Sequence, residues 1–211
     1  VLLSDANSVY NFDFNDLLDF HTKKDADITI VYKHGKLPKL EDTMAFSMDS
    51  TSRITEVSIS PRTDKQEVDF SFNIILMRKS LLEYLITSSF SHNCTSFERD
   101  VIQSNVSSLK IFGYEADGFC EMIDSLQTYY DVNMSLLNPE NRRMLFKMKS
   151  PITTKICDNV PATYGLDSKV GNSLVADGCI INGTVENSIL FRGVYVEAGA
   201  VIRNSIIMQG T

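Results

Sequence analysis

The first 150 residues alternate short apolar runs with stretches whose apolar residues recur every three or four positions. The apolar runs have the length of β-strands and comprise residues 1–4, 27–32, 54–59, 70–76 and 109–114. The helical spacing occurs in residues 15–23, 79–86, 97–103 and 140–149. Because strands and helices mostly alternate along the chain, the pattern predicts an α/β domain with three layers.

The first apolar run is followed directly by an acidic residue. We expect residues 1–4 to form a buried parallel strand, joined through the helix at 15–23 to the strand at 27–32 as a βαβ unit. Asp5 then lies at the carboxyl end of a strand, where doubly wound sheets bind ligands or metal ions. A turn-forming role for Asp5 is the alternative, because Asp also favours turns. Residues 34–51 are polar, contain Gly35 and Pro38, and are expected to be irregular.

A second candidate site follows the strand at 109–114. A connector runs through Gly118 to a helix for which Ser125 is a suitable N-cap. The apolar stripe of this helix consists of Leu126, Tyr129, Tyr130, Met134 and Leu137. Loops that enter a helix beyond a strand end often carry ligand groups, so the connector residues Cys120, Glu121, Met122, Ile123 and Asp124 are candidates.

The pattern changes after about residue 160. Aliphatic residues recur every six positions at Leu190, Val196, Ile202 and Met208, and glycines occupy turn positions. A six-residue aliphatic period is typical of a left-handed parallel β-helix built from hexapeptide repeats. We therefore predict two domains, 1–160 and 161–211. We also expect the last coil to pair with another copy of the chain or to have a mobile tail.

Charge and composition exclude several classes of partner. The net charge of −7 and the lack of a Lys/Arg cluster argue against nucleic acid and against an anionic membrane surface. No apolar run is long enough to span a bilayer. The chain begins at Val1 without a signal-like segment, so we expect it to be a piece of a longer polypeptide.

The four cysteines and three histidines show no paired spacing of the kind that metal sites need. We expect free thiols in a reducing compartment, and hence a cytoplasmic protein. The cysteines are Cys94, Cys120, Cys157 and Cys179, and the histidines are His21, His34 and His92.

Two stretches carry a resemblance to a known family. Residues 114–137 are similar to the family motif Y-x-F-x-G-Y-W-R-D-V-G-T-(I/V)-x-x-Y-(W/Y/F)-x-A-N-M-x-L-L. Residues 173–183 and 188–191 resemble its segments S-L-V-x-x-G-C-x-I-x-G and S-V-L-F. Residues 96–103 look like its D-F-G-K-D-I-I-P segment. The chain thus resembles the glucose-1-phosphate adenylyltransferases, or ADP-glucose pyrophosphorylases. The first motif is matched at Tyr114, Gly118, Phe119, Tyr129, Tyr130, Asn133, Met134, Leu136 and Leu137.

The resemblance implies a partial nucleotide-diphospho-sugar transferase domain followed by the start of the β-helix. It also implies transfer of an adenylyl group from ATP to glucose 1-phosphate, with Mg²⁺ as cofactor. By this resemblance Asp5 matches a family metal ligand, and Ser71 lies in the sugar-binding segment. The family's glycine-rich nucleotide loop would precede Val1.

The departures from the family pattern fall on chemically active positions. Met122 stands where the family has a metal-binding Asp, and a thioether is a poor ligand for Mg²⁺. Glu121 replaces an Arg beside the phosphates. Four further positions depart from the family pattern. Asp124 replaces a Gly, and Asn73 replaces the Gly of the sugar-binding segment. Ile59 and Ser60 replace the Glu and Lys of F-x-E-K-P.

These departures favour a regulatory subunit of glycogen biosynthesis with little or no activity of its own. The resemblance then implies assembly with a catalytic homologous subunit or self-association, and no Mg²⁺ bound by this chain. Two alternatives stay open. One is an assembly module without a ligand, and the other is a hexapeptide acyltransferase, although no His follows His92 to act as a general base.

Overall fold

The computed structural model describes residues 1–38, 40, 42–61, 67–91, 96–154 and 158–211. Contacts within the chain group into two compact units, Val1–Asp124 and Ser125–Thr211. The change in sequence pattern near residue 160 predicts a different division, which would leave residues 125–160 with the first domain. That boundary stays a prediction.

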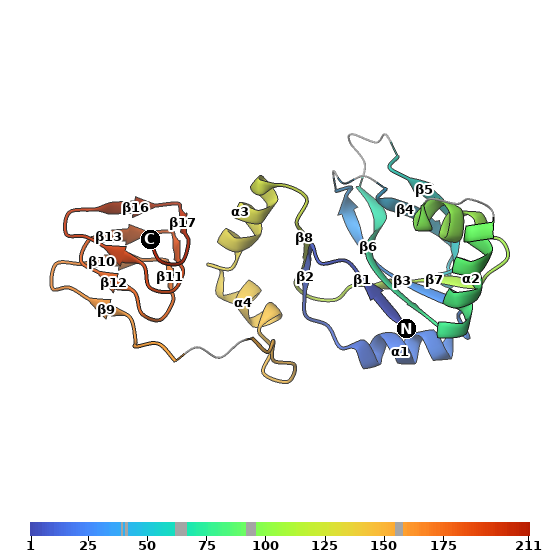
Figure 1. Ribbon diagram of the computed structural model, residues 1–211, viewed down its shortest axis with the longest axis horizontal. Coiled ribbons are helices and arrows are strands. Elements are labelled where there is room, and N and C mark those ends of the chain that lie inside the picture. Colours follow the sequence, from blue (N-terminus) through green and yellow to red (C-terminus); the bar gives the residue numbers. More distant parts are fainter. Residues whose placement is uncertain (39, 41, 62–66, 92–95, 155–157) are drawn as a thin grey trace. The chain divides into compact units, whose positions relative to one another are not determined.

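A mixed six-stranded sheet forms the centre of the first unit (Figure 1). Its strands have the order β5-β4-β6-β3-β7, and β1 pairs with β6 beside this path. Only β3 and β7 are parallel neighbours, and the other pairs are antiparallel. The strands are β1 (Leu2–Ser4), β3 (Ile28–Lys36), β4 (Met44–Met48), β5 (Ile54–Ile59), β6 (Glu67–Met77) and β7 (Ile111–Glu115).

Each face of the sheet carries its own apolar cluster. One face packs Ile28, Ile30 and Ile75 against α2 (Lys79–Ser91) and the π-helix η1 (Phe97–Ile102), which is followed by the 3₁₀ turn η2 (Gln103–Asn105). The opposite face packs Val31 and Phe72 beneath α1 (Phe14–Lys23). The three-layer α/β arrangement is therefore confirmed.

The first strand is not the buried parallel strand that its apolar run predicts. β1 runs antiparallel to β6 and is partly exposed. β3 also runs antiparallel to β6, so β1 and β3 are parallel but have β6 between them. An apolar run indicates a strand, but it cannot show that β6, a later strand, lies between β1 and β3 in the sheet.

Three strands were not expected from the sequence. β4 lies within the stretch predicted to be irregular, and its Met44, Ala45 and Phe46 are buried. β2 (Ser8–Tyr10) and β8 (Cys120–Met122) form an antiparallel pair, so the predicted connector is partly a strand. At three residues each, β2 and β8 are too short to show a period, and β4 is recognisable only from its burial.

Two helices open the second unit. α3 (Leu126–Ser135) has Ser125 as its N-cap, as predicted, and the Ser125 hydroxyl accepts from the amide of Thr128 in a capping box. The predicted stripe is only partly correct, because Leu126 is 84% exposed. α4 (Pro139–Leu145) ends earlier than its charged pattern suggests, and Asn138 is its N-cap.

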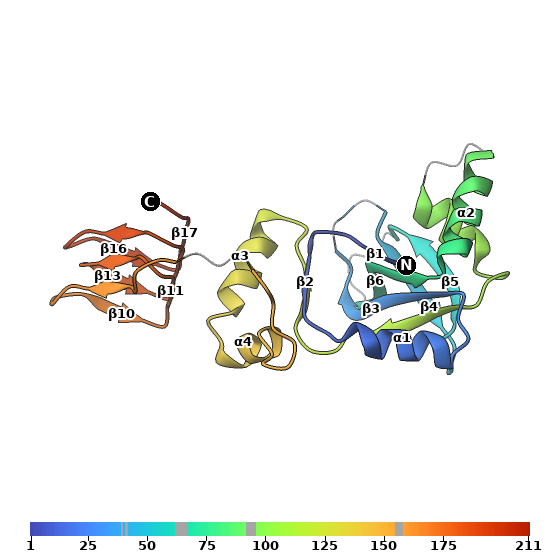
Figure 2. The ribbon, with the colours of Figure 1, turned by 60° about the horizontal axis from the view of Figure 1, so that its bottom comes forward.

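The remaining strands form a parallel β-helix, which confirms the interpretation of the six-residue period (Figure 2). Each of its three faces is a three-stranded parallel sheet. Ile181, Val185, Leu190 and Val196 point into a dry core. The strands are β9 (Thr163–Tyr164), β10 (Lys169–Gly171), β11 (Leu174–Val175), β12 (Ile180–Ile181), β13 (Thr184–Glu186), β14 (Ile189–Leu190), β15 (Tyr195–Val196), β16 (Val201–Arg203) and β17 (Ile206–Ile207).

A ladder of asparagines joins successive coils at one corner of this β-helix. Asn172 donates to the Oδ1 of Asn187 at 2.9 Å, and Asn187 donates to the Oδ1 of Asn204 at 2.6 Å. All three residues have positive φ, which Asn tolerates better than other residues with a Cβ. The corner thus fixes both the turn of the backbone and the register between coils.

Replacement of the central Asn187 tests the ladder. Asn187→Gly keeps access to the left-handed conformation but loses both ladder hydrogen bonds, so we expect a loss of about 1 kcal/mol of unfolding free energy. Asn187→Ala adds backbone strain and should lose about 2 kcal/mol. Urea unfolding of the two variants measures these losses. If Ala proved no worse than Gly, the backbone part of this account would be wrong.

Candidate functional site

The pairing of β6 with its neighbouring strands brings several of the predicted site residues together. β4 pairs with Asp69 and Phe70 on one edge of β6, and β1 pairs with residues 74–76 on the same edge. Ser71, Phe72 and Asn73 therefore lie where the end of β1 approaches the start of β4. Asp5 follows β1 at this point.

Asp5 is joined to Asn73 by a hydrogen bond between their side chains. The Nδ2 of Asn73 donates to the Oδ2 of Asp5 at 2.8 Å. The Ser71 Oγ accepts from the Asn73 amide at 2.9 Å, so Ser71 supports the backbone of this segment. The structure thus brings together Asp5, Ser71 and Asn73, three of the residues that the sequence selects.

Asn73 keeps a backbone conformation that usually belongs to glycine. Its φ is +53°, and it lies where the β3–β6 register shifts, since Val31 pairs with Ile74 but Tyr32 pairs with Ser71. Such a bulge needs a residue that enters the left-handed region, and Asn does so more readily than other residues with a Cβ. Asn73 therefore suits the bulge, and its side-chain amide reaches Asp5.

Ile59 and Ser60 lie at the end of β5, which is separated from β6 by β4. Ile59 pairs with Met44 of β4, and the Ser60 amide donates to the carbonyl of Thr43 at 2.8 Å. Ser60 has a φ of +44° and an exposed side chain. A hydroxyl here carries no charge, so this position offers no cationic contact to a sugar phosphate.

Glu121 forms an ion pair with a residue that the sequence analysis did not select. The Nζ of Lys33 on β3 lies 2.9 Å from the Glu121 Oε1, and it also donates to the Cys120 carbonyl at 2.7 Å. The acid at this position is thus neutralised within the protein. The sequence contains one signal for Lys33, since this residue directly follows a predicted strand of mostly apolar residues. No local pattern identifies Glu121 as its partner.

Met122 is buried in an apolar environment. It pairs with Ser8 across the β2–β8 ribbon and is 8% exposed. Its cluster contains Phe12, Phe72 and Ile74. The position therefore provides a thioether among hydrocarbon side chains, where the cost of desolvating a charge is high.

Asp124 lies beyond β8 and directly before the N-cap residue Ser125. It closes the first compact unit, whereas Ser125 begins the second.

These residues do not suit Mg²⁺, which prefers several oxygen ligands in octahedral geometry. The carboxylate of Asp5 accepts from an amide, that of Glu121 is paired with Lys33, and Met122 contributes no oxygen. In the described ranges, His, Cys, Asp and Glu form no group of three or more that could hold a metal ion.

The same region contains buried oxygens without partners. These are the Oδ1 of Asn7, the Oγ of Ser8 and the Oδ1 of Asn73. Each can accept a hydrogen bond, so ordered water or the hydroxyls of a ligand would relieve the cost of their burial. The arrangement is polar and suited to hydroxyl groups, and it has few positive charges for phosphate.

Cys120 and Cys179 carry buried thiols rather than a disulfide, in agreement with the expectation of reduced cysteines. Cys94, Cys157 and His92 lie outside the residues that the structure describes. No helix among the described residues is long and apolar enough to cross a membrane.

Comparison with known proteins supports the resemblance along both units. The sequence model of the family described as "GlmU-like, C-terminal hexapeptide" matches residues 158–211. The chain is 32% identical to the glycogen biosynthesis protein GlgD of Bacillus subtilis over 96% of its length and 49% of that protein. It is 31% identical to the glucose-1-phosphate adenylyltransferase of Geobacillus stearothermophilus over 96% of its length and 53% of that protein.

The glucose-1-phosphate adenylyltransferase of Clostridium perfringens is 27% identical over the whole chain and 54% of that protein. The chain thus spans about half the length of the curated relatives that it matches. The resemblance to the glucose-1-phosphate adenylyltransferases is confirmed.

The environment of Met122 generates a prediction. Met122→Asp places a carboxylate in an apolar cluster, so we expect a loss of at least about 3 kcal/mol of unfolding free energy at neutral pH. Met122→Leu keeps an apolar side chain of similar volume and should lose less than about 1.5 kcal/mol. Urea unfolding with and without Mg²⁺ measures both, and Mg²⁺ should stabilise neither variant. An Asp variant as stable as the parent and further stabilised by Mg²⁺ would show that the metal site is intact.

Proposed function

We propose that this chain, a relative of the glucose-1-phosphate adenylyltransferases, belongs to a regulatory subunit of glycogen biosynthesis. The subunit makes little or no ADP-glucose itself. It assembles with a catalytic homologue in the cytoplasm and changes the rate, substrate affinity or effector response of that homologue.

The observation that carries the proposal is the burial of Met122 among aromatic and aliphatic side chains. Adenylyl transfer moves charge onto phosphate oxygens, and enzymes stabilise that charge with cations and preorganised donors. A buried thioether contributes neither. The nearby Asp5–Asn73 hydrogen bond and Lys33–Glu121 ion pair occupy charged groups that could otherwise act on a substrate.

The local structure supports a role in which the fold matters more than the chemistry. Asn73 adopts the left-handed conformation of the β6 bulge, and Ser125 caps the helix after the connector. We therefore propose no Mg²⁺ bound by this chain and a homologous subunit as its partner.

An assembly module without any ligand is the second candidate. The unpartnered oxygens of Asn7, Ser8 and Asn73 favour a subunit that still binds a hydroxylated ligand. The full-length protein distinguishes the two, since a ligand at 100 times its dissociation constant stabilises the native state by about 2.7 kcal/mol. Thermal unfolding with glucose 1-phosphate, ATP or a glycolytic phosphate measures this effect.

Co-expression tests the proposed function. We expect the full-length chain to co-purify with the catalytic homologue and to change its rate, substrate affinity or effector response by several-fold. The homologue expressed alone is the control for ADP-glucose synthesis. An unchanged rate, affinity and effector response would remove the regulatory interpretation, even if the two chains co-purified.

A further inference from the structure

A histidine on β3 lies between two carboxylates of the neighbouring strand β6. His34 is directly opposite Asp69 in the antiparallel ladder. Its Nδ1 lies 2.8 Å from the Oδ1 of Asp69. Its Nε2 lies 3.8 Å from the Oε2 of Glu67, two residues earlier on β6. Both nitrogens of the ring are therefore close to an acid on the same neighbouring strand.

The other charges around His34 come from β3 and β7. Glu115 of β7, the strand on the other side of β3, adds a third carboxylate whose charge acts on the ring. Lys36 lies two residues after His34 and is opposite Glu67 in the ladder. β4, which pairs with the other edge of β6, contains no charged residue. The surroundings of the ring are thus mostly negative.

These surroundings favour the imidazolium form of His34. The hydrogen bond with Asp69 raises the pKa of His34, the charges of Asp69, Glu67 and Glu115 also raise it, and desolvation opposes them. Because the pKa is raised, the contact contributes fully below the ordinary pKa of histidine, about 6.5. The contribution is lost as the pH rises through the pKa of the folded state, which lies above about 6.5.

The part of β6 that His34 contacts leads directly into the candidate site. Asp69 precedes Ser71 by two residues, and the register against β3 shifts between Ser71 and Ile74. The Ser71 Oγ accepts from the amide of Asn73 within this bulge. A bulge disrupts the ladder of backbone hydrogen bonds, so a side-chain contact just before it helps to hold the strand in place.

We propose that His34, Asp69 and Glu67 form a pH-dependent clasp between β3 and β6. The protonated imidazole holds the segment before the Asn73 bulge, and loss of the proton to solvent loosens that segment. A neutral ring can still donate one hydrogen bond to Asp69, but the attraction between opposite charges is gone. The clasp does not depend on the regulatory function proposed above, and it stands even if the chain has no effect on a homologue.

The titration of the His34 ring in the full-length protein tests the clasp. NMR spectra from about pH 5.5 to about pH 8.5 should give a His34 pKa above about 6.5. Asp69→Asn removes the nearest negative charge and should lower that pKa by at least about 0.5. Glu83→Gln is the matched control, since it removes an equal charge from the exposed Lys79–Glu83 pair, and it should leave the His34 titration unchanged.

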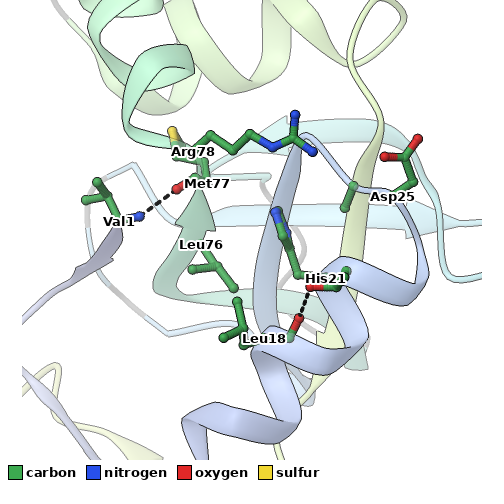
Figure 3. A pocket seen from close by; sticks show the side chains of 9 residues that line it. Val1, Leu18, His21, Asp25, Leu76, Met77 and Arg78 are labelled. Atoms are coloured by element: carbon green, nitrogen blue, oxygen red, sulfur yellow. Dashed lines mark hydrogen bonds between the residues drawn. The ribbon is translucent and has the colours of Figure 1, made fainter.

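His21 is a reference within the same spectra. Its ring is directed from α1 toward Arg78 (Figure 3), and its Nδ1 lies 2.8 Å from the Oγ1 of Thr29. Burial lowers the pKa of His21. His21 should therefore titrate at a lower pH than His34 and respond to neither substitution.

Hydrogen exchange in the same protein measures the effect on the strand. After correction for intrinsic exchange, the amides of residues 68–71 should exchange at least about twice as fast at about pH 8 as at about pH 6. His34→Gln keeps a donor for Asp69 but does not titrate, so it should abolish this difference. The proposal would be overturned by a His34 pKa at or below about 6.5, by equal effects of Asp69→Asn and Glu83→Gln, or by unchanged pH dependence in His34→Gln.

Discussion

The pairing of β6 on both of its edges determines where every part of the first unit lies. One edge pairs with β3 along nearly its whole length, and the other edge is shared by β4 and β1. The register shift at Asn73 lies between the two partners of the shared edge, and it requires a positive φ. This bulge sets the position of Ser71, of Asn73 and, through a hydrogen bond, of Asp5. The bulge tolerates few residue types, because it needs a backbone conformation that most side chains disfavour.

The substitutions in this region act as a set. A neutral amide bonds to Asp5, a lysine neutralises Glu121, and a thioether fills the space among Phe12, Phe72 and Ile74. Each change satisfies or buries a group that would otherwise be available to a metal ion or a phosphate. Together they describe a site whose groups are stabilised within the protein, which is the arrangement expected of a binding or structural role rather than of phosphoryl chemistry.

Local patterns predicted the helices and the long strands well, because amphipathic spacing and apolar runs depend only on nearby residues. The N-cap at Ser125 and the β-helix were predicted for the same reason. The pairing of β1 with β6, the short β2–β8 ribbon and the Lys33–Glu121 pair depend on residues far apart in sequence. No local pattern contains that information. Position after a strand selected Asp5 and the connector residues, the family resemblance added Ser71, Asn73, Ile59 and Ser60, and the contacts among them came only from the structure.

The central claim is that the scaffold of an adenylyltransferase is retained while its metal chemistry is lost. The most direct measurement is ADP-glucose synthesis by the full-length protein, purified free of any homologue and supplied with ATP, glucose 1-phosphate and Mg²⁺. Loss of one transition-state contact commonly lowers the rate about 10²-fold to 10³-fold. The account predicts a rate at least about 10³-fold below that of a catalytic homologue. A rate within about tenfold of that homologue would contradict it.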